Sequence, residues 1–525
     1  MRRSNQGLRV WCLVLLTAYI QLLPAQQLPD SWFNLDPAKD KVMGVSTNKA
    51  YDGLLKGKTA VTVIVAVIDG GTDIEHPDLK TNIWTNTQEI EGNGIDDDHN
   101  GFIDDMHGWN FIGGKTGDVQ YDQLEKTRIF KKYFPIFENH PDVVKARPEE
   151  YKLYVKAKES FLKERADVET NIEQLTITRN WMEKVKKSIG KDSLKVEDVI
   201  AYPEADSLLL KKKERIIRAM STGNTFESLL TNMENSIKAN QIKFDYNYNA
   251  DFDARSIVGD NYEDVSEHNY GNNSLKGPES RHGTHVAGII GAIRGNNVGM
   301  DGVADKVQLM ILRVVPNGDE RDKDVANAIR YAVDNGAKVI NMSFGKNFGF
   351  NKIAVDEAVQ YAISKDVLII HAAGNEALNL DSAIRYPNPI YQNKKGNAWK
   401  YWIDVGAVAA NGTPGVFSNY GKKYVDLFAP GVKIYSTLPD NDYGNLNGTS
   451  MAAPVCAGVA ALIRSYFPKL TAPDVKKIMM KSVTPIKEEV QLPGKKEIKV
   501  KWSALCKSGG VVNAYQAVLI ANKLK

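Results

Sequence analysis

Cysteine is scarce in this sequence, which has only three such residues among 525. Cys12 lies in an apolar stretch near the N-terminus, so the body of the chain has two, Cys456 and Cys506. The sequence therefore does not describe a fold built on disulfide bonds. An exported location would permit a bond between the two, but we expect free thiols. Cys456 follows small residues in an apolar run and is typical of a buried core position.

An excess of charge of one sign is also lacking. There are 67 Lys and Arg residues against 64 Asp and Glu residues, which gives a formal net charge of +3. A near-balanced charge gives no sign of a nucleic-acid partner. With 43% hydrophobic and 25% charged residues, the composition is that of an ordinary globular protein. Its length is more than a single core of typical size needs.

Only one long apolar run is present, and it lies at the N-terminus. Arg2, Arg3 and Arg9 precede the stretch 10–23, and Ala25 follows it. This pattern predicts a secretory signal peptide over residues 1–25, and hence an exported protein that is secreted or periplasmic. The alternative is an uncleaved membrane anchor, but the run is short for a span. No transmembrane segment is expected after removal of the signal.

The most informative stretch of the sequence surrounds Ser450. It reads Asn-Gly-Thr-Ser-Met-Ala-Ala-Pro over residues 447–454, and an apolar run follows. This pattern predicts a serine at the start of a buried helix, where free backbone N–H groups could receive an oxyanion. An ordinary helix N-cap is the alternative. A serine also needs a base, and the base needs an orienting group.

Two upstream stretches provide both groups. Residues 61–71 form an apolar, β-branched run that ends in Asp69 and two glycines, which predicts a buried parallel strand with the carboxylate at its carboxyl end. Residues 281–290 place His282 at the start of a helix rich in small residues. Because parallel sheets bind ligands beyond the carboxyl ends of their strands, Asp69, His282 and Ser450 could meet there.

The order Asp, His, Ser and the three local sequences resemble subtilisin-like serine proteases, the subtilases of peptidase family S8. The resemblance implies an α/β fold with a doubly wound, mostly parallel sheet. It also implies a serine endopeptidase that cleaves polypeptides through Ser450 as nucleophile, His282 as base and Asp69 as orienting carboxylate. Asn375 resembles the oxyanion-hole residue of the family. The substrate-binding walls that the resemblance implies are Ser343, Phe344, Gly345, Ala372, Ala373 and Gly374.

An acidic loop follows the Asp69 strand. Oxygen-bearing side chains alternate over residues 96, 98 and 100, Phe102 would offer its backbone carbonyl and Asp104 a further oxygen, and Gly101 stands where an EF-hand loop turns sharply. His107 stands where such a loop has its bidentate Glu, so we expect a partial loop completed by another segment or by water. A solvated turn is the alternative. The predicted cofactor is a structural Ca²⁺, with the ligands Asp96, Asp98, Asn100, Phe102 and Asp104.

The resemblance is interrupted over residues 115–265, which are too many for a bare loop. From residue 149 to residue 189, large apolar residues recur every seven positions, which predicts one long helix. Two further helices are expected over 206–220 and 226–237. The sequence thus divides into a signal peptide (1–25), an arm (26–54), a peptidase domain (55–114 and 266–525) and a helical insertion (115–265).

The role of the insertion stays open between a lid, a docking surface for a partner and a surface element without a role in chemistry. Two alternatives to a secreted endopeptidase follow. One is a latent or non-catalytic protein that binds a partner on this fold. The other is an exopeptidase or processing enzyme that the insertion gates. The loop 316–323 carries several charges, and we expect it to favour basic substrate residues near the cleft.

Overall fold

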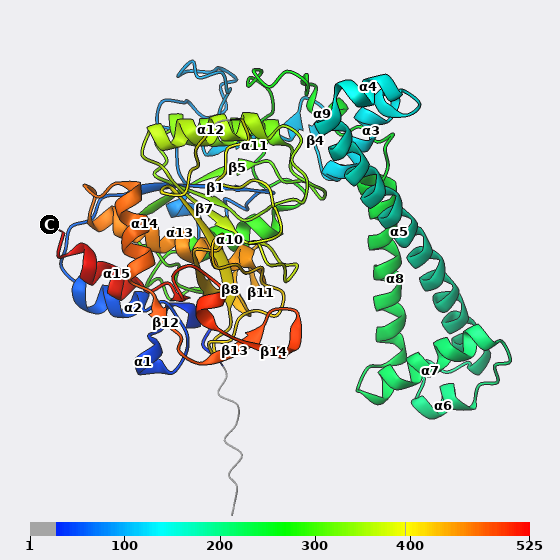
Figure 1. Cartoon of the computed structure of the whole chain (residues 1–525). Coiled ribbons are helices and arrows are strands. Elements are labelled where there is room, and N and C mark those ends of the chain that lie inside the picture. The colour runs from blue at the N-terminus through cyan, green and yellow to red at the C-terminus, as the bar shows by residue number, and fades with distance from the viewer. Residues whose placement is uncertain (1–27, 394, 525) are drawn as a thin grey trace, which may run out of the picture.

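A nine-stranded sheet forms the centre of the structure (Figure 1). The computed structural model describes residues 28–393 and 395–524, so the predicted signal peptide and Cys12 lie outside the described residues. All neighbouring strands are parallel except the last pair at one edge. This confirms the predicted doubly wound α/β fold. The order is β12 (Thr484–Pro485), β15 (Gly510–Val511), β9 (Leu427–Pro430), β8 (Trp402–Val408), β7 (Leu368–Ala372), β6 (Val339–Met342), β1 (Val63–Asp69), β5 (Val307–Arg313) and β2 (Gly108–Asn110).

Helices cover both faces of this sheet, which explains why its central strands are apolar on both sides. In β1, Val65 and Val67 pack on one face, whereas Ala66 and Ile68 pack on the other. The first face is covered by α10 (Ser280–Gly291), α13 (Thr449–Tyr466), α14 (Ala472–Lys481) and α15 (Ala514–Ala521), and the second by α11 (Asp322–Asp334) and α12 (Lys352–Ser364).

Strand β1 lies at the point where the strand order reverses. The chain passes from β1 to β5 on one side and then to β6 on the other side. The residue Ile68 pairs in register with Leu312 and with Met342, so the three carboxyl ends meet at one edge. Open parallel sheets bind ligands at this kind of edge, because connections that leave in opposite directions open a crevice beyond the carboxyl ends of the strands.

The remaining short elements surround this core. Trp32 and Phe33 of the N-terminal arm are buried, and Trp32 Nε1 donates a hydrogen bond to the Lys433 carbonyl. Cys456 and Cys506 are free and buried, as predicted. Among residues 28–393 and 395–524, no helix combines the length and the apolar composition of a membrane span.

The minor elements are α1 (Pro37–Asp40), α2 (Thr47–Lys49), β3 (Gly113–Gly114), β4 (Gly117–Asp118), β10 (Ile434–Leu438), β11 (Asp442–Leu446), β13 (Glu489–Leu492), β14 (Lys495–Lys501), η1 (Trp32–Asn34), η2 (Ala50–Leu54), η3 (Lys80–Asn82), η4 (Lys243–Asn247) and η5 (Trp502–Ala504).

The helical insertion projects from the sheet domain as a long arm (Figure 1). Its longest helix, α5, runs from Pro148 to Ile189 without a break, where the seven-residue pattern predicts a helix. Four residues of that pattern, Tyr154, Phe161, Val168 and Met182, are buried. Helix α8 returns beside α5, and α6 and α7 lie at the far end. The helices are α3 (Glu125–Phe137), α4 (Pro141–Ala146), α5 (Pro148–Ile189), α6 (Val196–Ala201), α7 (Ser207–Ser221), α8 (Phe226–Ile242) and α9 (Arg255–Val258).

Buried charges join the base of this insertion to the sheet domain. Lys346, which follows the end of β6, is fully buried and lies 2.7 Å from Asp322 and 3.5 Å from Glu125 of α3. Arg128 of α3 also pairs with Glu125. Separating the partners of a buried ion pair would leave an uncompensated charge in the interior. Such pairs therefore hold the two segments that carry them in fixed positions. The insertion is thereby held against the segment that follows β6.

Candidate active site

Asp69 is the last residue of β1 and lies at the carboxyl edge of the sheet. Its side chain is almost fully buried, and its Oδ1 accepts a hydrogen bond from the Gly70 N–H at 2.8 Å. Such a carboxylate has a fixed orientation and a charge that little solvent screens.

His282 is the third residue of α10 and faces this carboxylate. Its Nδ1 lies 2.8 Å from Oδ1 and 3.0 Å from Oδ2 of Asp69. Burial lowers the pKa of His282, but the charge of Asp69 and the hydrogen bond to it raise the pKa by more, so it lies above the usual 6.5. The contact holds the proton on Nδ1, which leaves Nε2 free to accept one.

Ser450 is the second residue of α13, directly after the loop that ends in Gly448. Its Oγ donates a hydrogen bond to the Ser343 carbonyl at 2.9 Å, and the Ser343 hydroxyl donates in return to the Ser450 carbonyl at 3.0 Å. The structure thus pairs Ser450 with the end of β6 and pairs His282 with Asp69. There is no hydrogen bond between Ser450 and His282.

Asn375 follows β7 and lies against the start of α13. Its Oδ1 accepts hydrogen bonds from the N–H of Thr449 at 2.9 Å and from its Oγ1 at 3.1 Å. Because the oxygen is held in this way, the Nδ2 group is the free end of the amide, and it has no hydrogen-bond partner among the described residues. Asn375 therefore presents a donor beside the residue that precedes Ser450.

The predicted substrate walls come from two adjacent strands. Ser343, Phe344 and Gly345 follow β6, whereas Ala372 ends β7 and the two residues after it follow that strand. Gly374 has a φ of +104°, and a Cβ placed there would lie 2.4 Å from the Asn419 amide nitrogen. Only glycine fits both restrictions. The two segments lie side by side, since β6 and β7 are paired.

The charged loop 316–323 does not present its charges to a cleft. Glu320, Arg321, Asp322 and Lys323 are buried. Arg321 pairs with Asp122 at 2.7 Å, and Lys323 pairs with Asp260 at 2.7 Å. These charges meet partners within the protein, so they give no basis for the expected preference for basic substrates.

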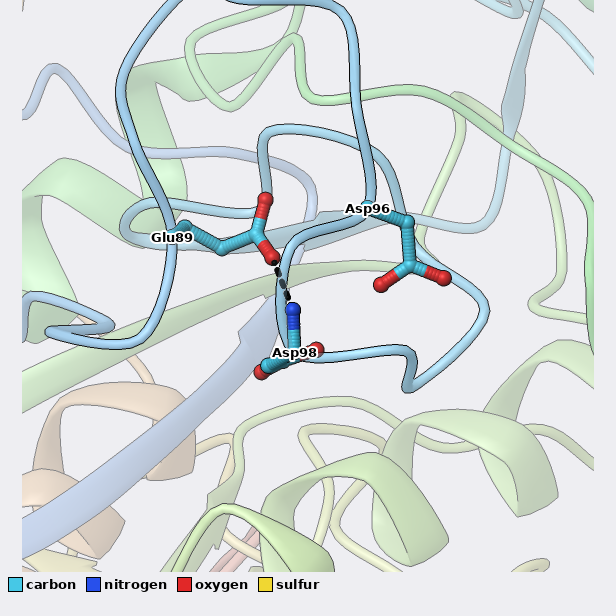
Figure 2. Close-up of side chains that lie close together, drawn as sticks. All are labelled: Glu89, Asp96 and Asp98. Atoms are coloured by element: carbon cyan, nitrogen blue, oxygen red, sulfur yellow. Dashed lines mark hydrogen bonds between the residues drawn. The ribbon is translucent and has the colours of Figure 1, made fainter.

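The acidic loop brings only part of the predicted ligand set together (Figure 2). Asp96 and Asp98 have carboxylate oxygens within 4.8 Å of each other and of a third carboxylate, Glu89. The sequence pattern did not predict Glu89. Glu89 accepts hydrogen bonds from the N–H groups of Asp97 and Asp98, which fold the loop around it.

Of the other three predicted ligands, Asp104 is the only carboxylate, and it does not belong to this group. The Asn100 amide nitrogen donates a hydrogen bond to Asp98, and its amide oxygen accepts one from the Phe102 N–H. Asp104 has a φ of +53°, and its carboxylate accepts hydrogen bonds from the N–H groups of Asn93 and Gly94. No hydrogen bond restrains the Phe102 carbonyl among the described residues.

Two further residues beside the predicted walls are not part of any motif that the sequence shows. Arg385 and His371 lie next to the predicted walls, and both line one cavity of about 760 Å³. Arg385 is in a segment without a motif, and His371 precedes the Ala-Ala-Gly-Asn stretch without a partner in sequence. Its Nδ1 lies 2.6 Å from Asp404, which is on the next strand. Only the pairing of β7 with β8 brings these two residues together.

The fold and this arrangement define an α/β protein whose serine, histidine and carboxylate lie at the carboxyl edge of a parallel sheet. The model of the subtilase family, peptidase S8, matches residues 61–500. The chain therefore belongs to the subtilase family, whose subtilisin and thermitase members are serine endopeptidases.

Two curated relatives agree with this assignment. Subtilisin DY of Bacillus licheniformis is 39% identical over 206 residues, which are 39% of this chain and 70% of that protein. Thermitase of Thermoactinomyces vulgaris is 42% identical over 185 residues, which are 35% of this chain and 61% of that protein. A solved protease structure from Pseudoalteromonas arctica is 30% identical, with a TM-score of 0.37, and the match covers 46% of this chain and 70% of that one. The chain thus spans less than two thirds of the length of thermitase.

Proposed function

We propose that this protein is a secreted serine endopeptidase that cleaves peptide bonds through Asp69, His282 and Ser450 by way of an acyl-enzyme. The observation that carries the proposal is the 2.8 Å contact between His282 Nδ1 and Asp69 at the sheet edge where α13 begins with Ser450. Membership of the subtilase family supports the same reaction.

The first half of the reaction forms a bond between Ser450 Oγ and the carbonyl carbon of the substrate. The hydroxyl must first turn from the Ser343 carbonyl to Nε2 of His282, which accepts its proton as the bond forms. Asp69 stabilises the resulting imidazolium. The carbon–nitrogen bond of the substrate then breaks, and His282 returns the proton to the departing amine.

The second half of the reaction releases the acyl group. Water gives a proton to His282 and attacks the acyl carbon, the bond to Ser450 Oγ breaks, and the proton returns to Oγ. In both halves, negative charge develops on the carbonyl oxygen of the substrate. The Nδ2 group of Asn375 and the Ser450 N–H at the start of α13 would donate hydrogen bonds to this oxygen and so stabilise its negative charge.

Substrate binding in this proposal uses the two wall segments. The residues after β6 would pair with an extended substrate backbone as an added strand. Export follows from the predicted signal peptide, whose residues lie outside the described part of the chain. Docking of a partner on the helical insertion stays a prediction from the sequence.

Calcium binding is proposed for the acidic loop. Three carboxylates within 4.8 Å repel one another unless a cation lies between them, and oxygen ligands suit Ca²⁺. Glu89, Asp96 and Asp98 would hold the ion, and it would stabilise the loop rather than take part in the reaction. The structure favours Glu89 over Asp104 in this set, because Glu89, and not Asp104, belongs to the group of carboxylates within 4.8 Å of one another.

Labelling with a fluorophosphonate tests the proposed function. The purified, folded protein should be modified at Ser450 alone, as read by mass spectrometry of its peptides. Cleavage of peptides with blocked ends would then separate an endopeptidase from an exopeptidase. Failure of the folded protein to react would instead favour the latent or partner-binding alternative.

Replacement of Asn375 by Ala is expected to lower kcat by about 10²–10³-fold with little change in KM, because one oxyanion donor is lost. The change also removes an acceptor for the Thr449 N–H, so thermal stability should be measured in parallel. Asn411→Ala, in an exposed loop, is the matched control. A KM effect that exceeds the kcat effect would contradict the assigned role.

Removal of calcium is expected to lower the melting temperature. At a Ca²⁺ concentration 100 times Kd, a single site stabilises the folded state by about 2.7 kcal/mol. Asp98→Asn should remove most of the difference between calcium and chelator in a thermal melt. Asp97→Asn is the matched control, since the Asp97 carboxylate accepts from Ile90 and Asn93, outside the group of three. Identical melts with calcium and with chelator would contradict the site.

A further inference from the structure

One guanidinium occupies the space between the two predicted walls. A Cβ added at Gly345 would lie 3.5 Å from Arg385 Nη2, and a Cβ added at Gly374 would lie 3.4 Å from Arg385 Cζ. These two glycines belong to different wall segments. Arg385 therefore contacts both sides of the pocket that the walls would form for the substrate side chain before the cleaved bond.

Arg385 is fixed in this place. Its side chain is only 11% exposed. Nη2 donates to the Gly345 carbonyl at 2.8 Å, while Nη1 donates to Asn347 at 3.0 Å and pairs with Glu376 at 2.8 Å. The next residue, Tyr386, exchanges two backbone hydrogen bonds with Lys346. A preorganised guanidinium loses little entropy when it binds a ligand.

The polar groups at this place have hydrogen-bond donors to spare. A guanidinium has five N–H donors, and the Nε–H and one Nη2–H of Arg385 have no partner among the described residues. Each oxygen of the Glu376 carboxylate already has one donor, since Oε1 pairs with Arg385 and Oε2 accepts from Asn419. Arg385 can therefore donate further hydrogen bonds to a ligand.

His371 is a second, independent indication of a polar ligand. Its Nε2 would also lie 3.5 Å from a Cβ at Gly345. The ring is 3% exposed, Asp404 holds Nδ1, and Nε2 is buried without a hydrogen-bond partner. Buried polar atoms in proteins are nearly always paired. His371 and Arg385 line the same cavity, which Ala373 of the second wall also borders but Ser450 does not.

We propose that the primary pocket of this protease takes an acidic side chain, glutamate or aspartate, whose carboxylate is bound by Arg385. The inference rests on the proposed function and adds its substrate class. A guanidinium and a carboxylate form paired, charge-assisted hydrogen bonds, which are stronger than neutral ones. A lysine side chain would meet a cation in the same place, and an apolar one would leave the donors without an acceptor. Glu376, with 39% of its side chain exposed, is the counter-ion of Arg385 in the free protein.

The test measures kcat/KM on four internally quenched peptides that differ only in the residue before the cleaved bond, which is Glu, Gln, Leu or Lys. We expect the Glu peptide to exceed the Gln peptide by about 10- to 100-fold, the range of a hydrogen bond to a charged group. Arg385→Gln should abolish that advantage, and Arg385→Glu should transfer it to the Lys peptide. Arg218→Gln, an exposed change at the far end of the insertion, should keep the ratio of the native protein.

Fluorophosphonate labelling of each variant separates the two proposals. If Ser450 reacts but the native protein cleaves the Leu or Lys peptide best, the acidic pocket is wrong and the protease assignment stands. The same conclusion follows if Ser450 reacts and the Glu peptide is not cleaved, or if Arg385→Gln keeps the preference for Glu. If Ser450 of the folded native protein does not react, the proposed function fails and the pocket assignment falls with it.

Discussion

Ser450→Ala is expected to lower kcat by about 10⁶-fold, because the serine forms the covalent bond and no neighbouring group can replace it. Some activity above the uncatalysed rate should remain, since Asn375 and the substrate walls are unchanged. The measurement is hydrolysis of fluorescein-labelled casein, with fluorophosphonate labelling of the same samples. Labelling should disappear together with activity.

Ser465→Ala is the matched control for this experiment. Ser465 is on the same helix, α13, and its buried hydroxyl donates to the Leu462 carbonyl, away from the site. It should keep both activity and labelling. If Ser450→Ala kept more than a small percentage of native activity while folded, another nucleophile would be responsible and the proposed mechanism would be wrong.

Asp69→Asn is expected to lower kcat by about 10⁴-fold while the fold is kept. The amide can hydrogen-bond to His282, but it carries no charge to stabilise the imidazolium, and it can favour the wrong tautomer. The KM should change little, because Asp69 is buried behind His282 and does not face the substrate walls. Steady-state kinetics with a cleaved peptide give both constants.

The same variant should change the pH dependence in a definite direction. Hydrolysis needs neutral His282, so kcat/KM falls as the pH drops through the pKa of this residue. Asp69 holds that pKa above 6.5. Without the carboxylate the pKa falls, and the acid limb of the profile of the residual activity should move to lower pH. An acid limb at the native position would show that another group controls it.

Asp73→Asn is the matched control for the pH profile. Asp73 is also buried near the end of β1, but its carboxylate pairs with Lys276 at 2.9 Å and accepts from the Asp440 N–H. Loss of this pair should reduce stability, yet the acid limb should stay at its native pH. The contrast between the two variants isolates the contact of Asp69 with His282.

The sequence predicted the parts of the site that depend on local structure. Asp69 ends an apolar strand, His282 lies in the first turn of a helix of small residues, and Ser450 lies two residues after Gly448 at the start of another helix. Each position follows from residues within about ten of it. The same holds for α5, where the seven-residue apolar pattern requires only a helix with one buried side.

The acidic loop shows where local pattern was insufficient. The alternating oxygens indicated a cation site, and the structure does bring Asp96 and Asp98 together. The pattern could not show that the Asp104 carboxylate is used on Asn93 and Gly94, or that Glu89 takes a place beside the first two. Both depend on how the preceding turn folds back over the loop, which spacing alone does not encode.

The sequence by itself predicted the family, the doubly wound sheet and the three proposed reacting groups, because these depend on short motifs and on periodic burial. Only the tertiary structure decided what surrounds them. Lys346 meets Glu125 across 221 positions, His371 meets Asp404 on the neighbouring strand, and Arg385 reaches Gly345 from a segment without a motif. Such contacts depend on strand pairing and on the path of long connections. That is why the proposed substrate preference and the attachment of the insertion depend on the folded chain and not on the sequence pattern.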